Sequence, residues 1–230
     1  MQRIFDIVFS LLALIVLSSL LIPVVILLRL TGEGEIFYLQ ERIGKDGKPF
    51  RLYKFATMLR NSPSFGTGTV TIKNDPRILP IGRFLRKTKI NELPQLINIL
   101  FGDMSLIGPR PLTRQAFDFY SDRAKSVISR VRPGLSGVGS IIFRTEEDVL
   151  SGASSSLNFY KEIIAPYKGE LEIWFVKNNN LSNYFKAILV TVVVVIIPKS
   201  QISWRVFAGL PIPPEELKKA LGFVRREQET

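Results

Sequence analysis

The sequence predicts an α+β protein that is mainly helical, with an apolar membrane segment at its N-terminus and a small domain with short strands. Three observations lead to this prediction. Residues 7–28 carry no charge, which is roughly the length needed to cross the apolar core of a bilayer. Residues 36–55 alternate around a glycine-containing turn, as paired strands do. Apolar residues recur at helical spacing in residues 91–100.

The composition restricts the chemistry that this chain can perform. Of its 230 residues, 46% are hydrophobic and 22% are charged, which favours one globular domain with a membrane element over several membrane spans. Neither cysteine nor histidine occurs, which excludes disulfides, thiolate metal sites and a Ser-His-Asp triad. Any metal should therefore be a hard ion held by oxygen, with Mg²⁺ the first choice for phosphate chemistry. The net charge of +11 favours an anionic membrane surface and phosphorylated ligands over nucleic acid.

Pro23 lies inside the apolar N-terminal segment. Proline removes one main-chain hydrogen bond and kinks a helix, and Ser18 and Ser19 lie where hydroxyls can satisfy the freed carbonyl. Two topologies remain open. One is a spanning helix with a mild kink, which the residues alone favour. The other is a re-entrant helix-break-helix that enters and leaves the membrane by the same face. A cleavable signal is not expected, because the apolar run is too long and no small-residue cleavage site follows it.

Turn signals divide the next part of the chain. Residues 36–43 and 50–55 predict two strands joined by a turn at Gly44–Gly47, and together a small hairpin near the membrane. Residues 61–74 are rich in Gly, Ser, Thr and Pro and predict a loop. Helical spacing returns at residues 81–85.

The pattern from Asn91 to Leu100 predicts an amphipathic helix with Pro94 in its first turn, where proline is tolerated. Residues 113–130 predict a second helical stretch and residues 132–137 a cluster of turns. Further helices are expected at residues 157–165, at residues 183–197, and in a short charged tail from Glu215. The valine-rich segment 183–197 is short for a membrane span, so we expect a buried or interfacial helix there.

Glu92 is the best catalytic candidate by position, because it lies at the N-terminus of a predicted helix, where the dipole and free N–H groups attract anions. Basic residues crowd the approach to it and predict a phosphate-binding site. They are Arg83, Arg86, Lys87 and Lys89. The alternative is an ordinary capping glutamate beside a basic stripe that faces solvent or the membrane.

Arg110 stands between two prolines, which restrict its backbone and hold its guanidinium for bidentate contact with phosphate. The alternative is a loop arginine that pairs with a nearby carboxylate. Asp75 and Arg77 can form a local ion pair. Asp103 can be a metal ligand or a turn cap, and the cap is preferred. Lys54 is a cation between aromatic residues, and it indicates nothing by itself.

A series of motifs covers nearly the whole chain in one order. They are Gln40–Gly44, Lys54–Met58, Asp75–Arg77, Gly82–Arg86, Glu92–Leu96, Asn98, Gly102–Ser105, Gly108–Pro111 and Arg132–Gly137, with Arg3 and Asp6 before the membrane segment. In these residues the chain resembles the small monotopic phosphoglycosyl transferases, also called bacterial sugar transferases or polyprenyl-phosphate hexose-1-phosphate transferases.

The resemblance implies transfer of a sugar-1-phosphate from a UDP-sugar to undecaprenyl phosphate, with release of UMP and with Mg²⁺ as cofactor. It implies a location at the bacterial inner membrane, where the product initiates a lipid-linked glycan. It also implies that residues 1–30 form a re-entrant membrane helix broken near Pro23, which reverses the topology favoured above. Residues 31–200 would form a cytoplasmic catalytic domain and residues 201–230 a C-terminal extension. The expected partners are the two substrates, membrane lipid and, in a homodimer, a second copy, but no nucleic acid.

The resemblance gives Glu92 a catalytic and metal-binding role, and it makes Lys54, Arg86 and Arg110 the phosphate-binding cations. Asn91 occupies the position of the aspartate nucleophile of the family. A neutral carboxamide cannot form the acyl phosphate that an aspartate forms. Three explanations are open: Glu92 acts as the nucleophile, transfer is direct with Asn91 only orienting groups, or the chain is a non-catalytic scaffold.

Overall fold

The computed structural model describes residues 1–31, 33–62, 75–151, 156–198 and 200–223. In these residues the chain is mainly helical with two short two-stranded sheets, which confirms the predicted α+β class. The chain forms two compact units. The first contains residues 1, 3–41 and 50–102, and the second contains residues 2, 42–49 and the chain from Asp103 onward. The functional division at residues 30 and 200 stays a prediction.

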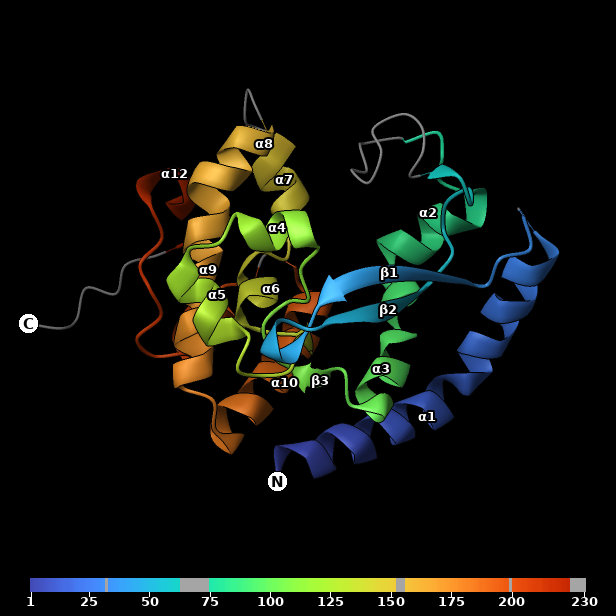
Figure 1. Ribbon diagram of the computed structural model, residues 1–230, viewed down its shortest axis with the longest axis horizontal. Coiled ribbons are helices and arrows are strands. Elements are labelled where there is room, and N and C mark those ends of the chain that lie inside the picture. The colour runs from blue at the N-terminus through green and yellow to red at the C-terminus, as the bar shows by residue number, and fades with distance from the viewer. Residues whose placement is uncertain (32, 63–74, 152–155, 199, 224–230) are drawn as a thin grey trace, which may run out of the picture. The chain divides into compact units, whose positions relative to one another are not determined.

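Helix α1 (Gln2–Leu30) continues across Pro23 and bends along its length (Figure 1). The expected break into two helices is therefore not seen, because proline removes one main-chain donor while the rest of the helical hydrogen bonding continues. The hydroxyls of Ser18 and Ser19 donate to carbonyls three residues upstream, at 2.7 and 3.4 Å, and not to the carbonyl that the proline leaves without a donor. Such side-chain bonds favour bending. The re-entrant arrangement stays a prediction.

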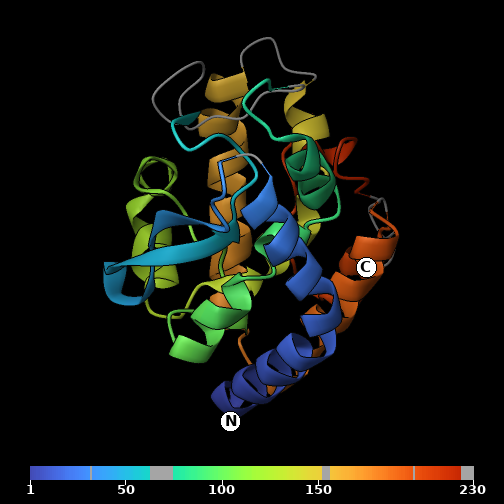
Figure 2. The same ribbon diagram turned by 90° about the vertical axis from the view of Figure 1, so that its right-hand side faces the viewer.

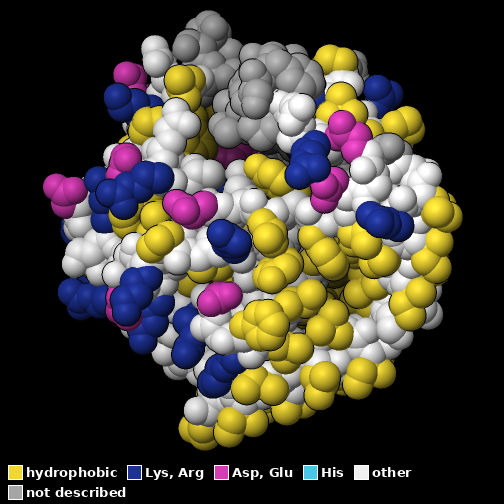
Figure 3. All heavy atoms as spheres, turned by 45° about the vertical axis from the view of Figure 1, so that its right-hand side comes forward, with side chains coloured by type: hydrophobic (Ala, Val, Ile, Leu, Met, Phe, Trp, Pro, Cys, Tyr) yellow, Lys and Arg dark blue, Asp and Glu magenta, His cyan; other side chains and the backbone are white. Residues whose placement is uncertain are grey.

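In the part of the chain that the structure describes, α1 is the helix long and apolar enough to cross a membrane. Only 11% of the most apolar 18-residue stretch of α1 is buried, and hydrophobic side chains gather over this helix (Figure 3). Its inner side belongs to the core of the first unit, where Val24 and Leu28 pack with Phe55 and Leu85.

The predicted hairpin is confirmed, with β1 (Phe37–Ile43) and β2 (Pro49–Phe55) paired in one sheet. The turn between them is a short 3₁₀ segment, η1 (Lys45–Gly47), in which Asp46 and Gly47 have φ values of 58° and 70°. Helix α2 (Pro80–Lys87) follows, and it covers the helical spacing seen at residues 81–85. Most of the predicted loop 61–74 lies outside the described residues.

The helix predicted from Asn91 begins later, as α3 (Gln95–Phe101), with Pro94 at its N-cap. Asn91 and Glu92 lie in a separate 3₁₀ turn, η3 (Ile90–Glu92). The spacing predicts an apolar face of Leu93, Leu96, Ile97 and Leu100. The buried face of α3 differs from it and consists of Gln95, Leu96, Asn98 and Ile99. The cause is Asn98, whose amide accepts a hydrogen bond from Tyr53 N (2.9 Å) and donates one to Arg51 O (2.8 Å). These two bonds turn a polar side of α3 toward β2.

A parallel sheet in the second unit was not predicted. Strand β3 (Ser105–Ile107) pairs with β4 (Gly134–Ser136), with Ser105 opposite Gly134 and Ile107 opposite Ser136. The turn cluster expected at residues 132–137 is therefore partly a strand. Strands of three residues are too short to show alternation, and the Pro-Gly pair in residues 132–137 predicts a turn instead.

The helical stretch predicted at residues 113–130 is two helices, α4 (Arg114–Asp118) and α5 (Asp122–Ile128). Thr113 and Ser121 cap them, each accepting a hydrogen bond from the main chain three residues later. Helix α5 lies beside α9 (Ala165–Lys177), as Figures 1 and 2 show. Leu112, Tyr120, Ala124, Ile128, Ala165 and Ile173 form the core between these elements.

The other helices of the second unit are short except one. They are α6 (Val138–Ile142), α7 (Glu146–Ser151), α8 (Ser156–Phe159), the π-helical η4 (Tyr160–Ile164), α11 (Ile202–Val206) and α12 (Glu215–Lys218). The longer α10 (Leu181–Ile196) confirms the predicted valine-rich helix. It buries Tyr184, Ala187 and Val190, while Leu189 and Ile196 are exposed, so it has both a buried and an open apolar side.

Candidate functional site

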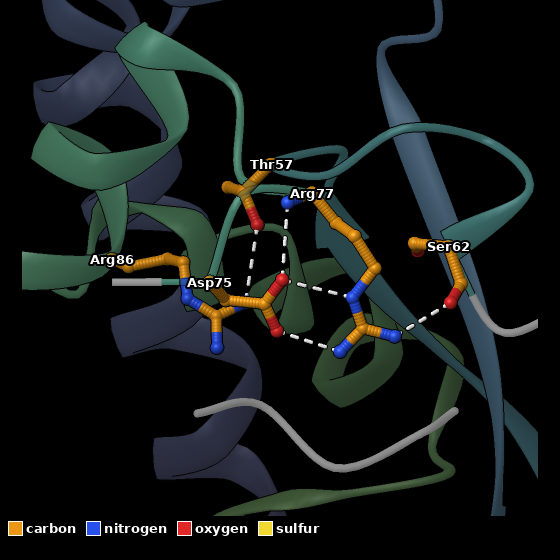
Figure 4. Close-up of polar contacts among 5 residues, drawn as sticks. All are labelled: Thr57, Ser62, Asp75, Arg77 and Arg86. Atoms are coloured by element: carbon orange, nitrogen blue, oxygen red, sulfur yellow. Dashed lines mark hydrogen bonds and ion pairs between the residues drawn. The ribbon is translucent and has the colours of Figure 1, made fainter. Parts of the chain in front are cut away.

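A buried ion pair organises the polar part of the first unit (Figure 4). The guanidinium of Arg77 holds the Asp75 carboxylate through two contacts, Nη2–Oδ2 at 2.6 Å and Nε–Oδ1 at 2.9 Å. Only 3% of the Arg77 side chain and 1% of the Asp75 side chain are exposed. Arg77 Nη1 also donates to Ser62 O at 2.7 Å, and the hydrogen bond to Asp75 raises the pKa of Arg77. The predicted ion pair is confirmed, and its burial gives it a structural role.

Thr57 contacts both the N-cap of helix α2 and the side chain of Arg86. Thr57 O accepts Leu79 N at 3.0 Å, and Arg86 Nη1 donates to Thr57 Oγ1 at 3.4 Å (Figure 4). Gly82 packs directly on Thr57, because a Cβ at Gly82 would lie 2.2 Å from the Thr57 carbonyl oxygen. Gly82 therefore allows α2 to pack against the backbone of Thr57, which brings Arg86, on the same helix, to the Thr57 hydroxyl.

Arg86 differs from the basic residues around it. Its side chain is half-buried, whereas Arg83, Lys87 and Lys89 are exposed. Lys89 has a φ of 62°, which reverses the chain between α2 and η3. The structure thus divides the predicted basic cluster into one arginine held by the fold and three cations on the surface.

Asn91 and Glu92 follow this reversal in η3. Asn91 is 8% exposed, and its Oδ1 is buried with no hydrogen-bond partner in the described structure. Leaving a buried amide oxygen without a partner costs about 1–3 kcal/mol, so such an atom is a candidate for contact with a ligand. Glu92 is half-buried, and it lies beside Asn91 in the chain. Lys54, on β2, is also half-buried and belongs to the same compact unit.

The described residues contain no group of three or more acidic side chains that converge as a metal site. Mg²⁺ does not require one, because it is commonly bound by one or two carboxylates, water and substrate phosphates. Glu92 and the unpartnered oxygen of Asn91 are hard oxygen donors of the kind that Mg²⁺ prefers. The residues present therefore fit a magnesium ion that reaches the site with a phosphate ligand.

Arg110 lies in the second unit, and two glycine-rich motifs position it there. Gly108 N donates to Ser136 O at 2.9 Å, and Gly134 N donates to Pro109 O at 2.8 Å. A Cβ at Gly134 would lie 2.1 Å from Gly108 N, so two backbones touch where a side chain cannot fit. These contacts leave Arg110 exposed at the end of the parallel sheet.

The second unit also contains a cluster of buried charged residues that sequence reasoning missed. Lys168 and Glu172 lie one turn apart on α9 and are 5% and 2% exposed. Lys168 Nζ pairs with Glu146 Oε1 at 2.6 Å and lies 5.0 Å from the ring centroid of Phe143 and 5.7 Å from that of Tyr160. The sequence signal was weak: apolar residues are distributed around α9, among them Tyr167, Leu171, Ile173 and Phe175, which indicates that some charged residue of the helix is buried but not which one.

Burial controls the protonation of this cluster. It raises the pKa of Glu172 to about 7, while the Arg110 backbone N–H, Lys168 and the charge of Arg110 lower it. Burial lowers the pKa of Lys168, and Glu146 opposes that change. Burial and Glu146 also raise the pKa of Tyr160 to about 12. Burial thus brings the pKa of Glu172 near neutral pH.

Comparison with known proteins gives one consistent result. The family model described as bacterial sugar transferase matches residues 1–198. The exopolysaccharide production protein ExoY of Sinorhizobium fredii is 38% identical over 159 residues, which cover 63% of this chain and 70% of that protein. The UDP-glucose:undecaprenyl-phosphate glucose-1-phosphate transferase of Escherichia coli K12 is 35% identical over 183 residues, which cover 76% of this chain and 37% of the relative.

A putative undecaprenyl-phosphate N-acetylgalactosaminyl 1-phosphate transferase of Bacillus subtilis is 46% identical over 110 residues, which cover 48% of this chain and 61% of the relative. The coverage differs among the relatives, and the chain spans about a third of the Escherichia coli transferase and of the similar proteins of Aeromonas hydrophila and Salmonella typhimurium.

Proposed function

The chain belongs to the bacterial sugar transferase family, and from this premise we propose that it transfers a sugar-1-phosphate from a UDP-sugar to undecaprenyl phosphate and releases UMP. The observation that carries the proposal is the family match over residues 1–198, which includes every candidate site residue. Relatives named as undecaprenyl-phosphate sugar phosphotransferases support the acceptor and the class of donor. The product would initiate a lipid-linked glycan.

The cations have a direct role in this reaction. A diphosphate donor is strongly anionic, and arginine binds phosphate oxygens in a bidentate manner. We assign Lys54, Arg86 and Arg110 to the phosphates, with Arg86 supported by its contact with Thr57. Mg²⁺ would be held by Glu92 together with phosphate oxygens, and it would neutralise charge that develops on the diphosphate.

Asn91 leaves two routes for the transfer. In direct transfer, an oxygen of the lipid phosphate attacks the phosphorus that carries the sugar, the P–O bond to the α-phosphate breaks, and UMP leaves with the electron pair. In the two-step route, a carboxylate oxygen of Glu92 attacks the same phosphorus first, the P–O bond to the α-phosphate breaks, UMP leaves with the electron pair, and an acyl phosphate forms. The lipid phosphate then attacks this intermediate and restores the carboxylate. Asn91 Oδ1, which has no partner in the described structure, is an acceptor, so it is available to a cation or to a hydrogen-bond donor of the substrate in either route.

The apolar surface of α1 supports attachment to a membrane. We propose the re-entrant arrangement at the bacterial inner membrane, with both ends of α1 on the cytoplasmic side, since a lipid phosphate and a soluble nucleotide sugar meet at that surface. The bend of α1 and the exposed aliphatic side chains along it are compatible with a helix that enters and leaves by one face.

The test is UMP release by the protein in nanodiscs, with Mg²⁺, undecaprenyl phosphate and a panel of UDP-sugars. The donor that gives UMP identifies the sugar. Folded protein that releases no UMP across a broad panel would rule out the proposed reaction.

Asn91 motivates a second candidate function, a non-catalytic scaffold that keeps the transferase fold. Asn91→Asp separates the two readings, because it restores a carboxylate at the family's nucleophile position. A silent protein that becomes active in this variant is a scaffold with an intact binding site. A protein that is active as it stands, with unchanged donor preference in the variant, is an enzyme that works without an aspartate.

Glu92→Gln distinguishes the two chemical routes. If Glu92 is the nucleophile, intact mass measured after incubation with donor alone shows a phosphosugar adduct that is lost in Glu92→Gln. UMP release that requires the lipid acceptor, with no adduct at any time, indicates direct transfer.

A further inference from the structure

The carboxyl group of Glu172 lies against the backbone of Arg110. Glu172 projects from the middle of α9 and is 2% exposed. The N–H of Arg110 donates to Glu172 Oε1 at 3.4 Å. This contact joins a buried acidic residue to the exposed arginine that the proposed function assigns to phosphate.

Helix α6 makes room for this carboxyl group. A Cβ at Gly139 would lie 2.4 Å from Glu172 Oε1, so any larger residue there would push the carboxyl away. The second oxygen, Oε2, is buried and has no hydrogen-bond partner in the described structure. A buried carboxyl with one oxygen left unsatisfied is costly for stability, and such groups in native proteins require an explanation. The buried carboxyl group is explained if its Oε1 is needed to accept the N–H of Arg110.

The arginine loop, residues Pro109–Pro111, needs an acceptor for the main-chain N–H of Arg110. Prolines have no amide hydrogen, so the segment Pro109–Pro111 has a single main-chain donor, the N–H of Arg110. The carbonyls on either side are already bound, since Gly134 N donates to Pro109 O at 2.8 Å and Arg42 Nη1 donates to Pro111 O at 3.2 Å. Glu172 supplies the remaining contact and fixes the centre of the loop.

We propose that Glu172 is a positioning residue which, by accepting the Arg110 N–H, fixes the direction in which the Arg110 guanidinium meets the phosphates of the donor. The proposal rests on the proposed function for its consequence in the reaction. The contact itself can be measured whether or not the chain is a transferase.

Amide hydrogen exchange tests the contact directly. In protein labelled with ¹⁵N-arginine, the Arg110 amide should exchange roughly tenfold faster in Glu172→Ala than in the wild type, as loss of one hydrogen bond predicts. Glu172→Gln keeps an oxygen acceptor and should retain most of the protection. Glu170→Ala is the matched control, because Glu170 lies on the same helix and pairs with Arg123 at the surface. Equal Arg110 exchange in the wild type and in folded Glu172→Ala would overturn the proposal.

A double-mutant cycle tests the consequence for the reaction. We expect Glu172→Ala to lower kcat/KM about tenfold or more, chiefly by raising KM for the UDP-sugar. Combined with Arg110→Ala, it should cause little additional loss, because both changes act through one side chain. Gly139→Ala keeps the carboxyl but displaces it, and it should behave like Glu172→Ala. Effects of Glu172→Ala and Arg110→Ala that multiply would show that Glu172 acts elsewhere.

Arg110 amide exchange and UMP release together show whether the positioning role or the proposed function has failed. UMP release that is absent from every variant, with Arg110 exchange still dependent on Glu172, contradicts the proposed function and leaves the positioning contact established. Normal UMP release with Arg110 exchange independent of Glu172 contradicts the positioning role alone.

Discussion

Glu172 should make the stability of the second unit depend on pH in a predictable direction. Burial raises its pKa in the folded protein to about 7 from an ordinary value of 4.5. Between these values the folded chain keeps the proton that the unfolded chain has lost, so the free energy of unfolding falls as the pH rises. Since a tenfold change in proton affinity corresponds to about 1.4 kcal/mol, the loss across this window is about 3 kcal/mol. The ionisable groups that face Glu172 are Arg110, Lys168 and Tyr120.

The perturbation is Glu172→Gln, which cannot ionise and has nearly the same shape. The difference in unfolding free energy between wild type and variant should change by about 3 kcal/mol from pH 4 to pH 8, with the wild type relatively more stable at the acidic end. The two tryptophans of the chain, Trp174 and Trp204, both lie in the second unit, so urea unfolding followed by tryptophan fluorescence reports on this region.

Glu170→Gln on the same helix is the control for this measurement. Its carboxylate is 44% exposed, and its removal should leave the pH profile nearly unchanged. A flat difference between wild type and Glu172→Gln across pH 4–8 would refute the reasoning, because the carboxyl would then titrate alike in the folded and unfolded chains.

Three further substitutions test the first unit and the arginine loop. Asn98→Leu removes both hydrogen bonds from α3 to β2 and should lower the free energy of unfolding by about 2–5 kcal/mol; an unchanged melting temperature would contradict the buried-amide account. Gly82→Ala places a methyl group 2.2 Å from Thr57 O and should lower both the melting temperature and UMP release, whereas Arg83→Ala on the exposed side of α2 should lower neither strongly. If the Arg110 guanidinium contacts phosphate, Arg110→Ala should lower kcat/KM roughly 30- to 5,000-fold, which corresponds to a loss of about 2–5 kcal/mol in transition-state stabilisation. A kcat/KM near that of the wild type would indicate that Arg110 has a structural role.

Local periodicity predicted the elements that are long enough to show it. The hairpin at residues 37–55, helix α2 and the valine-rich helix α10 were each visible because alternation or helical spacing persisted over several residues. The parallel pair β3 and β4 was missed because each strand has three residues and the partners lie far apart in sequence. The start of α3 was placed too early, since asparagine and glutamate are common where helices begin, but Asn91 and Glu92 form a separate 3₁₀ turn.

Candidate site residues could be selected from the sequence where a residue type by itself indicates chemistry. Arg86 and Glu92 could be selected as a cation and a carboxylate near a turn, and the structure places both in the first unit with Lys54. Glu172 could not be selected, because a glutamate on a helix is ordinarily solvent-exposed. Only the packing of α9 against α6 and the arginine loop shows that this carboxyl is buried.

The motifs that identify the family contain two kinds of residue. The first kind is glycine, which permits close backbone contacts at Gly82, Gly108 and Gly134. The second kind satisfies buried polar groups: Asn98 hydrogen-bonds the main chain of β2, and Asp75 and Arg77 neutralise each other's charge. These residues would be required in a scaffold as much as in an enzyme, so their presence supports the fold more strongly than it supports catalysis.

A buried polar atom that the fold leaves without a hydrogen bond is a stronger indication of ligand binding. Asn91 is the clearest case, because its amide oxygen is buried and accepts no hydrogen bond from the residues that the structure describes. A scaffold with no ligand would gain stability from an apolar residue at this position, since removing an unsatisfied buried polar atom is stabilising. The unpartnered oxygen is an acceptor, so its presence favours a site that receives a cation or a donor group of the substrate. Asn91→Leu should therefore raise the melting temperature and weaken donor binding together, and a variant that binds the donor as tightly as the wild type would contradict this argument.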